Sequence, residues 1–286
     1  MVDKQRYRQV LTYIEQHLDE PLDLTHLCAV SGLSKYHFHR QCSAVFKVPV
    51  ITLVKLLKLK RAAQQLAFRP LLKVIDIALV CGYDTHEGFS RAFKQYFALS
   101  PRDFRRAPDW TYWQTHYEPI ALLRESIMSD IDYLVELVDF DQVTLATFEH
   151  RGAPNTLWQT LRDFIDWRKS ESLAPARART FNLVYDDPRT TAADDYRFDL
   201  GCEVSHSENF TDRRVVKKTI PEGRCARIRY VGSDDGISAA VDYLYSHWLP
   251  KTEHSLRDFP LFFERVRFFP EVAEAHAVTD IFLPIE

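Results

Sequence analysis

A helical motif that occurs twice, fifty residues apart, is the feature that most constrains how this chain can fold. The first copy places an apolar segment, LTHLCAV, before Gly32 and a second helical segment, KYHFHRQCSAVF, after Ser34. The second copy repeats helix, turn and helix around Gly82, with Asp84 or Thr85 in the position of the cap. Glycine adopts the left-handed conformation of such turns at little cost, and serine is a favoured helix N-cap. The sequence therefore predicts two helix-turn-helix units.

The rest of residues 1–108 also has helical periodicity. Tyr7, Val10, Leu11, Ile14 and Leu18 follow the spacing of an amphipathic helix, and residues 51–68 predict one long helix that connects the two units. Residues 1–108 carry 17 Lys and Arg against 9 Asp and Glu, whereas the remainder carries 20 against 31. A basic part joined to an acidic part indicates an anionic partner for the first part only.

The two copies together resemble the DNA-binding domain of the AraC/XylS family of transcription regulators. The resemblance rests on GLSKYHFHR in the first copy, where Cys42 replaces the usual phenylalanine, and on IALVCGYDTHEGFSRAFKQYFALSPRDFR in the second. It implies that the second helix of each unit enters the major groove of double-stranded promoter DNA, and that RNA polymerase is a partner. The residues that would then read bases are Tyr36, His37, His39 and Arg40 in the first unit and His86, Glu87, Ser90 and Arg91 in the second.

Two arginines carry most of this expectation. Arg40 and Arg91 occupy matching positions, and an arginine can bridge O6 and N7 of guanine. Other basic residues are expected to contact phosphates, which position a protein on DNA without specifying the sequence. These residues are Lys35, Lys47, Lys94, Arg102, Arg105 and Arg106.

Residues 109–127 are rich in aromatic residues, contain Pro119, look poor in helix and read as a linker between two domains or as a docking segment. From residue 128 to residue 286 strand-like and helix-like segments alternate, and the pattern occurs twice. Glycines, acids and prolines recur at offsets of eighty to eighty-two residues, as the pairs Gly152 and Gly232, Asp199 and Asp280, and Pro188 and Pro270. The predicted fold is an all-α double helix-turn-helix domain (1–108), a linker (109–127) and an α+β domain (128–286) of duplicated β-α-β-β units in an antiparallel sheet.

The second domain resembles the GyrI-like effector-binding domains of bacterial regulators. The motifs are TIPEGRCARIRYVG, the strand that contains FERV, and the terminal TDIFLPI. The resemblance implies a groove between the two halves, in which the glutamate of the FE strand, here Glu264, meets a lipophilic aromatic cation. An offset of 82 places Asn182 opposite Glu264. Phe262 shares the strand face of Glu264, and the other expected walls of the groove are Trp158, Tyr230 and Phe282.

Two questions stay open at this point. Glu264 could instead be paired inside the fold by Arg227, by Arg229 or by a tyrosine hydroxyl, because a buried unpaired carboxylate is costly. The domain could also act as a small-molecule hydrolase with Glu264 activating water, or serve only as a protein-interaction module. The segment HRGAPN lacks an aromatic residue that is frequent in the family after the first glycine.

Composition narrows the class of protein further. No apolar run approaches the length of a membrane span, and the charged start of the chain lacks an apolar signal segment. The five cysteines are scattered without paired spacing, which favours free thiols. We therefore expect a cytoplasmic, nucleoid-associated regulator with no metal, no cofactor, no membrane partner and no catalytic site.

Overall fold

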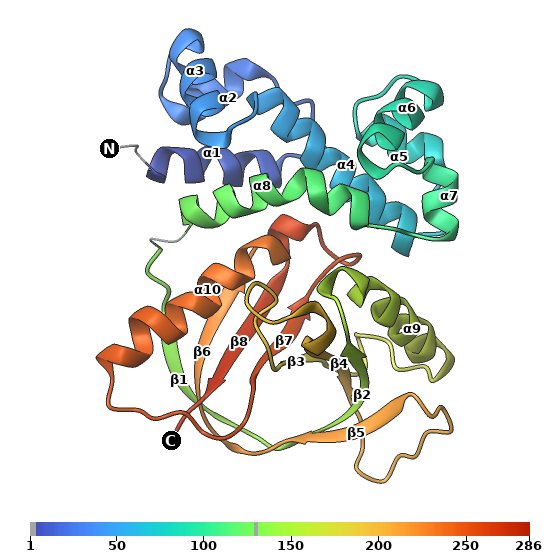
Figure 1. Ribbon diagram of the computed structural model, residues 1–286, viewed down its shortest axis with the longest axis vertical. Coiled ribbons are helices and arrows are strands. Elements are labelled where there is room, and N and C mark those ends of the chain that lie inside the picture. The colour runs from blue at the N-terminus through green and yellow to red at the C-terminus, as the bar shows by residue number, and fades with distance from the viewer. Residues whose placement is uncertain (1–3, 129–130) are drawn as a thin grey trace. The chain divides into compact units, whose positions relative to one another are not determined.

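The computed structural model describes residues 4–128 and 131–286 and divides the chain into two compact units (Figure 1). Residues 1–3 and 129–130, which fall inside the predicted domains, lie outside the described residues. Unit 1 comprises Met1–Ile131 with two later segments, Ser233–Gly236 and Phe269–Ala275. Unit 2 comprises Asp132–Gly232, Ile237–Phe268 and His276–Glu286.

Unit 1 is built from helices, as the sequence predicts. In the described residues these are α1 (Lys4–Gln16), α2 (Leu24–Ser31), α3 (Lys35–Phe46), α4 (Val50–Phe68), α5 (Val74–Val80), α6 (His86–Phe97), α7 (Pro101–Arg106) and α8 (Thr111–Met128). The predicted stripe of α1 is buried, and α4 is the predicted connecting helix. Its buried leucines and alanines pack against the phenylalanines of both helix-turn-helix units in one core.

The expectation that residues 109–127 are poor in helix is wrong. This segment forms most of α8, an eighteen-residue helix that contains Pro119. Trp113, Tyr117, Ile120 and Ile127 are buried in the core of unit 1, and the Trp113 ring stacks on Phe97 of α6 with centroids 4.8 Å apart. The burial of these large apolar side chains outweighs the helix-breaking tendency of one proline.

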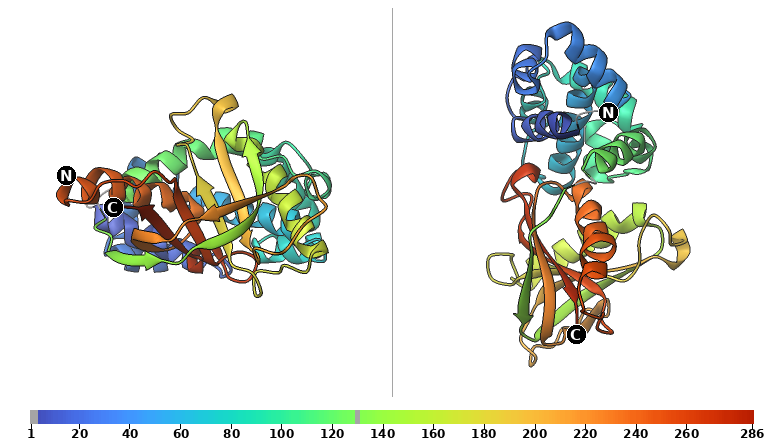
Figure 2. Two further views of the ribbon diagram at one scale, coloured as in Figure 1. Left: turned by 90° about the horizontal axis from the view of Figure 1, so that it is seen from below. Right: turned by 90° about the vertical axis from the view of Figure 1, so that its left-hand side faces the viewer.

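Unit 2 contains an eight-stranded antiparallel sheet, which confirms the predicted α+β class. Its strands are β1 (Val135–Phe140), β2 (Val143–Arg151), β3 (Thr180–Val184), β4 (Arg197–Glu203), β5 (Val215–Ile220), β6 (Gly223–Val231), β7 (Leu261–Arg267) and β8 (Val278–Pro284). They are arranged in the order β1-β6-β8-β7-β3-β4-β2-β5. The views of Figure 2 show that the strands twist strongly and fan out.

The predicted duplication is visible in the order of the elements. Each half reads strand, strand, helix, strand, strand, so each has one strand more than the expected β-α-β-β unit. The additional strands β1 and β5 each pair with the other half of the chain, on β6 and β2. The α-helices of unit 2 are α9 (Leu157–Ser170), of fourteen residues, and α10 (Ile237–Tyr243), of seven, and the chain also forms shorter turns. These are 3-10 helices at Pro154–Thr156, Ala193–Asp195, Asp234–Gly236, Leu249–Lys251 and Glu274–His276, and a π-helical turn at Leu244–Trp248.

The two faces of the sheet carry different cores. Residues of α10 pack against β6, β7 and β8, and residues of α9 pack against β2 and β4. The opposite face, which α9 and α10 do not cover, holds a third cluster centred on phenylalanines. Its largest members are Phe140, Phe181, Phe262 and Phe282. Within the described parts of the chain, no helix combines the length and the apolar character needed to cross a bilayer.

Candidate functional site

The two helix-turn-helix units have the local geometry that their glycines predict. Gly32 ends α2 with φ of 64°, in the left-handed region, and its backbone N–H donates to the carbonyl of Ala29. Gly82 has φ of 84° in the second turn. Thr85, rather than Asp84, caps α6, because its hydroxyl accepts a hydrogen bond of 3.1 Å from the Gly88 backbone N–H. Ser34 stands at the N-cap of α3 without making a side-chain cap bond.

Each second helix buries one face and exposes the other. Phe38, Cys42 and Phe46 are the buried residues of α3, and Phe89, Ala92, Phe93 and Phe97 are those of α6. Six of the eight predicted base-reading residues are exposed on the remaining faces, and Tyr36 is 86% exposed. The other two, His39 and Ser90, are half-buried, and the His39 ring lies at the edge of the Phe38 ring on the same helix.

The two arginines on which base reading mainly rests lie on the exposed faces of α3 and α6. Among the residues that the structure describes, neither Arg40 nor Arg91 takes part in a hydrogen bond or an ion pair, and both side chains are exposed. Ser90 lies 3.5 Å from the Nδ1 atom of His86 on the same helix. An exposed arginine of this kind stays hydrated in the folded protein and makes no internal contact that must be broken before it binds DNA. It can therefore bind a phosphate or a base edge directly.

The residues predicted to contact phosphates differ in exposure and in whether they are bound to other groups of the protein. Lys35, Lys47 and Lys94 are exposed, and so are Arg102 and Arg106, although Arg106 lies 3.4 Å from Asp103. Arg105 is half-buried and donates a hydrogen bond of 2.6 Å to the carbonyl of Leu72. Arg105 therefore ties α7 to the segment before α5, and we remove it from the candidate DNA contacts.

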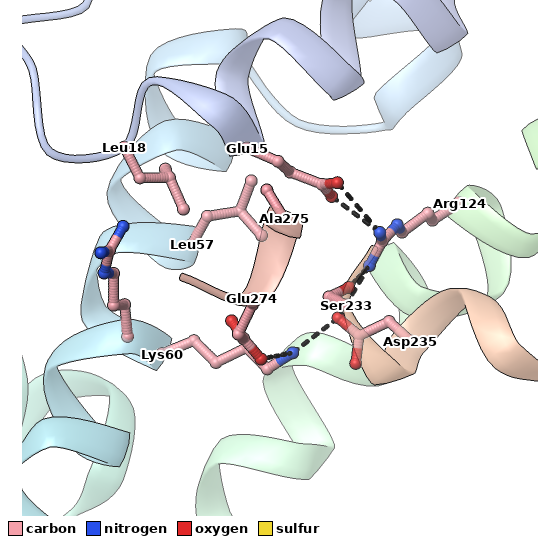
Figure 3. A pocket seen from close by; sticks show the side chains of 10 residues that line it. Glu15, Leu18, Leu57, Lys60, Arg124, Ser233, Asp235, Glu274 and Ala275 are labelled. Carbon is pink, nitrogen blue, oxygen red and sulfur yellow. Dashed lines mark hydrogen bonds and ion pairs between the residues drawn. The ribbon is translucent and has the colours of Figure 1, made fainter. Parts of the chain in front are cut away.

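Unit 1 also contains a cluster of mutually paired charges (Figure 3). Arg124 pairs with Glu15 and with Asp235, and Lys60 lies 2.7 Å from Asp235. Burial alone would raise the pKa of Asp235, but Lys60 and Arg124 outweigh it and lower the pKa well below its ordinary value. Tyr117 donates a hydrogen bond of 2.8 Å to the same carboxylate. Lys60, Arg124 and Tyr117 thus meet at one buried carboxylate, and the cluster joins distant segments of unit 1.

Glu264 lies in unit 2, at the edge of the phenylalanine cluster. It is on β7 and points to the face that α9 and α10 leave uncovered, beside Phe262 on its own strand and Phe181 on β3. The rings of Phe262 and Phe282 are stacked, with centroids 4.9 Å apart and planes at 11°. Only 17% of the Glu264 side chain is exposed. An acid therefore stands against aromatic rings that are themselves buried, on the face of the sheet that neither helix covers.

The ion pairs around Glu264 join more carboxylates than cations. Glu203, Asp280 and Glu136 each have a close guanidinium partner, at 2.7 Å between Asp280 and Arg229 and at 2.8 Å between Glu203 and Arg179. Glu264 has a longer contact of 3.7 Å, to the Arg179 group that already binds Glu203. Among the described residues, four carboxylates thus meet three arginines in these ion pairs, the third arginine being Arg227. The surplus negative charge falls on Glu264.

The other half of the sheet holds a matching cluster that is balanced. Asp199, the counterpart of Asp280, is fully buried and lies 2.6 Å from Lys218 and 2.9 Å from Arg151. Glu149 pairs with the same two cations, and the Tyr185 hydroxyl donates to Asp199 at 2.8 Å. Two carboxylates therefore meet two cations. The duplication preserves the buried aspartate, and only the half with Glu264 carries an additional acid.

The shifted pKa of Glu264 makes it possible to test how much the ionised carboxylate destabilises the fold. Burial raises the pKa above its ordinary value of 4.5, and Arg179 lowers it, while Asp280 and Glu203 raise it again. An acid whose pKa is raised by folding destabilises the fold as pH rises from the ordinary value through the raised one. We expect the melting temperature of Glu264→Gln, relative to the parent protein, to rise as the pH increases from the ordinary pKa of a glutamate through the raised pKa of Glu264. A difference that is constant with pH would contradict this assignment of the charge.

The prediction that Asn182 faces Glu264 is wrong. Asn182 pairs with Phe263 across β3 and β7, so it lies on the helix-covered face, where its amide is 3.5 Å from the Asp199 carbonyl. The offset of 82 came from prolines that follow the strands. A bulge between Arg265 and Arg267 adds one residue to β7 after Glu264. Inside the strands the offset is 81, and the counterpart of Glu264 is Leu183.

The other expected walls divide between the two faces. Phe262 and Phe282 lie on the face of Glu264, in the phenylalanine cluster. Tyr230 packs with residues of α10 on the opposite face, so its predicted place beside Glu264 is wrong. Trp158 is on α9, where its ring lies 6.0 Å from the guanidinium of Arg162, and the structure does not bring it together with Glu264.

Sequence reasoning missed Arg179, together with the two residues that it contacts here, Phe181 and Glu203. Arg179 stands just before β3, its guanidinium lies 5.2 Å from the centroid of the Phe181 ring, and it contacts both Glu203 and Glu264. Arg227 and Arg229, the expected internal partners of Glu264, pair with Asp280 instead. The recurrence of Asp199 and Asp280 at equal spacing was the one signal in the sequence that pointed to paired charge clusters.

Comparisons with known proteins agree with this division of the chain. Residues 134–286 match the GyrI-like small molecule binding domain, and residues 27–107 match a helix-turn-helix domain. The chain is 34% identical over 161 residues to the probable transcriptional regulator YgiV of Escherichia coli (strain K12), covering 55% of this chain and 99% of that protein. It is 37% identical over 106 residues to the right origin-binding protein of the same organism, covering 36% of each.

Among solved structures, the crystal structure of the EcmrR C-terminal domain covers 55% of this chain and 99% of its own, at 15% identity and a TM-score of 0.45. The match to residues 134–286 includes every strand of unit 2, and the helix-turn-helix match includes both glycine turns. The chain belongs to the GyrI-like small molecule binding family and carries an AraC-type helix-turn-helix domain ahead of its GyrI-like domain.

Proposed function

We propose that this DNA-binding transcriptional regulator senses a lipophilic aromatic cation, such as a drug or another toxic compound, through its GyrI-like domain. The observation that carries the proposal is the surplus carboxylate of Glu264, which is mostly buried beside Phe181 and Phe262. A flat cation would supply the missing charge and stack on aromatic rings, at about 0.5–2 kcal/mol for each such contact. Glu264, Phe262 and Phe282 are the proposed ligand contacts that remain.

The output of the proposed sensor is DNA binding. Helices α3 and α6 would enter the major groove of promoter DNA, with Arg40 and Arg91 reading base edges and RNA polymerase as the partner that responds. A ligand shifts an equilibrium only by binding one of two states more tightly than the other. The proposal therefore requires that the protein has two states that differ at Glu264, and it places the protein in the cytoplasm on DNA.

We propose sensing rather than catalysis for Glu264. A hydrolase would use this carboxylate as a general base, which needs an attackable substrate within hydrogen-bond reach. The relatives reported above are named as a probable transcriptional regulator and an origin-binding protein. Because the GyrI-like domain is fused to a helix-turn-helix domain, a bound ligand can change DNA binding by the same chain. An enzyme that destroyed the ligand would end this effect.

Ligand-dependent melting tests the proposal. We expect cations such as proflavine and tetraphenylphosphonium to raise the melting temperature, whereas neutral and anionic aromatics of similar size do not. A ligand present at a hundred times its dissociation constant adds about 2.7 kcal/mol to the free energy of unfolding, which a melting curve resolves. In Glu264→Gln the shift with cations should disappear, because the counter-charge is gone.

A matched control separates the site from the net charge of the protein. Glu253 is exposed on unit 2 and has no ion pair or hydrogen bond among the described residues, so Glu253→Gln changes the charge equally elsewhere. It should keep the full shift with cations. If no cation stabilises the parent protein, or if Glu264→Gln keeps the shift, the proposed sensing of cations at Glu264 is wrong.

A further inference from the structure

The site around Glu264 already holds a planar cation of its own. The Arg179 guanidinium carbon lies 5.2 Å from the centroid of the Phe181 ring, and Nη1 lies 3.7 Å from the Glu264 carboxylate. Guanidinium is flat, delocalised and weakly hydrated, and it stacks on aromatic faces as an aromatic cation does. A ligand that stacks on Phe181 and pairs with Glu264 would need the same space.

Arg179 is held in a way that allows it to leave. Its Nε and Nη2 atoms donate to Glu203 at 2.8 and 3.3 Å, and its contact with Glu264 is the longer one. Arg179 is 44% exposed and Glu203 is 40% exposed, so water can replace either partner at little cost. Only the side chain needs to move, because the Arg179 carbonyl is fixed by a backbone hydrogen bond from Glu203.

The neighbouring arginine is held differently. Arg229 donates two hydrogen bonds of 2.7 Å to Asp280, which is buried. Displacing Arg229 would leave a buried carboxylate without its partner, which is far more costly than exposing Glu203. Of the two guanidinium groups near Glu264, Arg179 is therefore the one that an incoming cation can displace.

We propose that Arg179 is an internal competitor that determines which cations the site accepts. The inference rests on the proposed function. A cation must bind Phe181 and Glu264 better than the tethered guanidinium does, so small or strongly hydrated cations are rejected and extended planar ones are accepted. When a ligand occupies the site, the displaced Arg179 stays paired with Glu203. The strength of the pair between Arg179 and Glu203 therefore determines how tightly a cation must bind to displace Arg179 from Glu264.

Fluorescence titration with proflavine, a planar cation, tests the inference in the full-length protein without DNA. Arg179→Ala removes the competitor and should bind proflavine about tenfold more tightly than the parent protein. Arg179→Lys keeps the charge but loses the planar fork and should fall between the two. Glu203→Gln removes the charge that pairs with Arg179, so Arg179 should pair more strongly with Glu264. This variant should therefore bind proflavine more weakly than the parent protein.

Arg214→Ala is the matched control. Arg214 lies 5.2 Å from the Phe148 ring and pairs with Asp212 and Asp163, so it has the same kind of contacts away from Glu264. Its loss should leave proflavine binding unchanged. Melting curves establish that each variant is folded, and the opposite signs expected for Arg179→Lys and Glu203→Gln keep the test decisive if Arg179→Ala is unstable.

The outcomes separate this inference from the proposed function. If the parent protein binds proflavine and Arg179→Ala binds it equally or more weakly, displacement of Arg179 is wrong, while sensing of cations stands. If only Arg179→Ala binds, a planar cation does not displace Arg179 in the parent protein, so both the displacement and the sensing of such cations by the parent protein are wrong. If neither the parent protein nor any variant binds a planar cation, both are wrong.

Discussion

Replacing Asp199 by asparagine is expected to lower the free energy of unfolding by about 3 kcal/mol. The Asp199 carboxylate is fully buried and accepts from Lys218, Arg151 and Tyr185 at 2.6, 2.9 and 2.8 Å. An asparagine of the same shape would leave the two cations with Glu149 alone. This loss of stability is at the lower end of the range for breaking a buried ion pair, because the side chains of Lys218 and Arg151 keep some access to water. Chemical denaturation measures the loss, and hydrogen exchange of β4 amides assigns it to unit 2.

Glu264→Gln is the matched comparison, because it is the same change of a carboxylate to an amide on the same face of one sheet. Here no loss is expected at neutral pH, since the removed charge was in surplus and burial raises its pKa. The two variants thus distinguish a charge that holds the fold together from one that costs stability and is available for binding. Equal losses in both would show that our account of the charges around Glu264 is wrong.

The sequence could predict unit 1 because its signals are local. Gly32 and Gly82 lie at turns that only a few residues define, and the apolar stripe of α1 repeats within one helix. The signal for α8 is also local, because Trp113, Tyr117, Ile120 and Ile127 follow helical spacing across Pro119. A regular apolar stripe therefore indicates this helix more strongly than one proline and an aromatic composition argue against it.

The site in unit 2 could be predicted only in part, because its contacts join strands far apart in the chain. Glu264 and Phe262 share a strand, so their common face follows from alternation. Placing Asn182 required a register across two strands, and one bulge in β7 was enough to put it on the wrong face. The pairing of Arg179 with Glu203 and Glu264 depends on three strands at once, and no local pattern encodes it.

Removing the two exposed arginines of the recognition helices is expected to abolish selective DNA binding. Arg40→Ala and Arg91→Ala should each weaken binding to a preferred site by about 1–3 kcal/mol, the range for losing one bidentate contact to guanine. The two positions lie in separate helix-turn-helix units, so the losses should add approximately in the double variant. Selection of binding sites from random DNA by the parent protein identifies the preferred sequence, and competition at fixed salt then measures each variant.

Lys94→Ala provides the control that separates base reading from electrostatic attraction. Lys94 is exposed on α6, like Arg91, and is a predicted phosphate contact. Its loss should weaken binding to all sequences alike and reduce the salt dependence by about one counterion, without changing the selected sequence. Arg40→Ala and Arg91→Ala should instead relax the preference at separate positions of the site. If either arginine variant behaves like Lys94→Ala, that arginine contacts phosphate, and the reading of bases must be sought in the histidines and Glu87 of the same two helices.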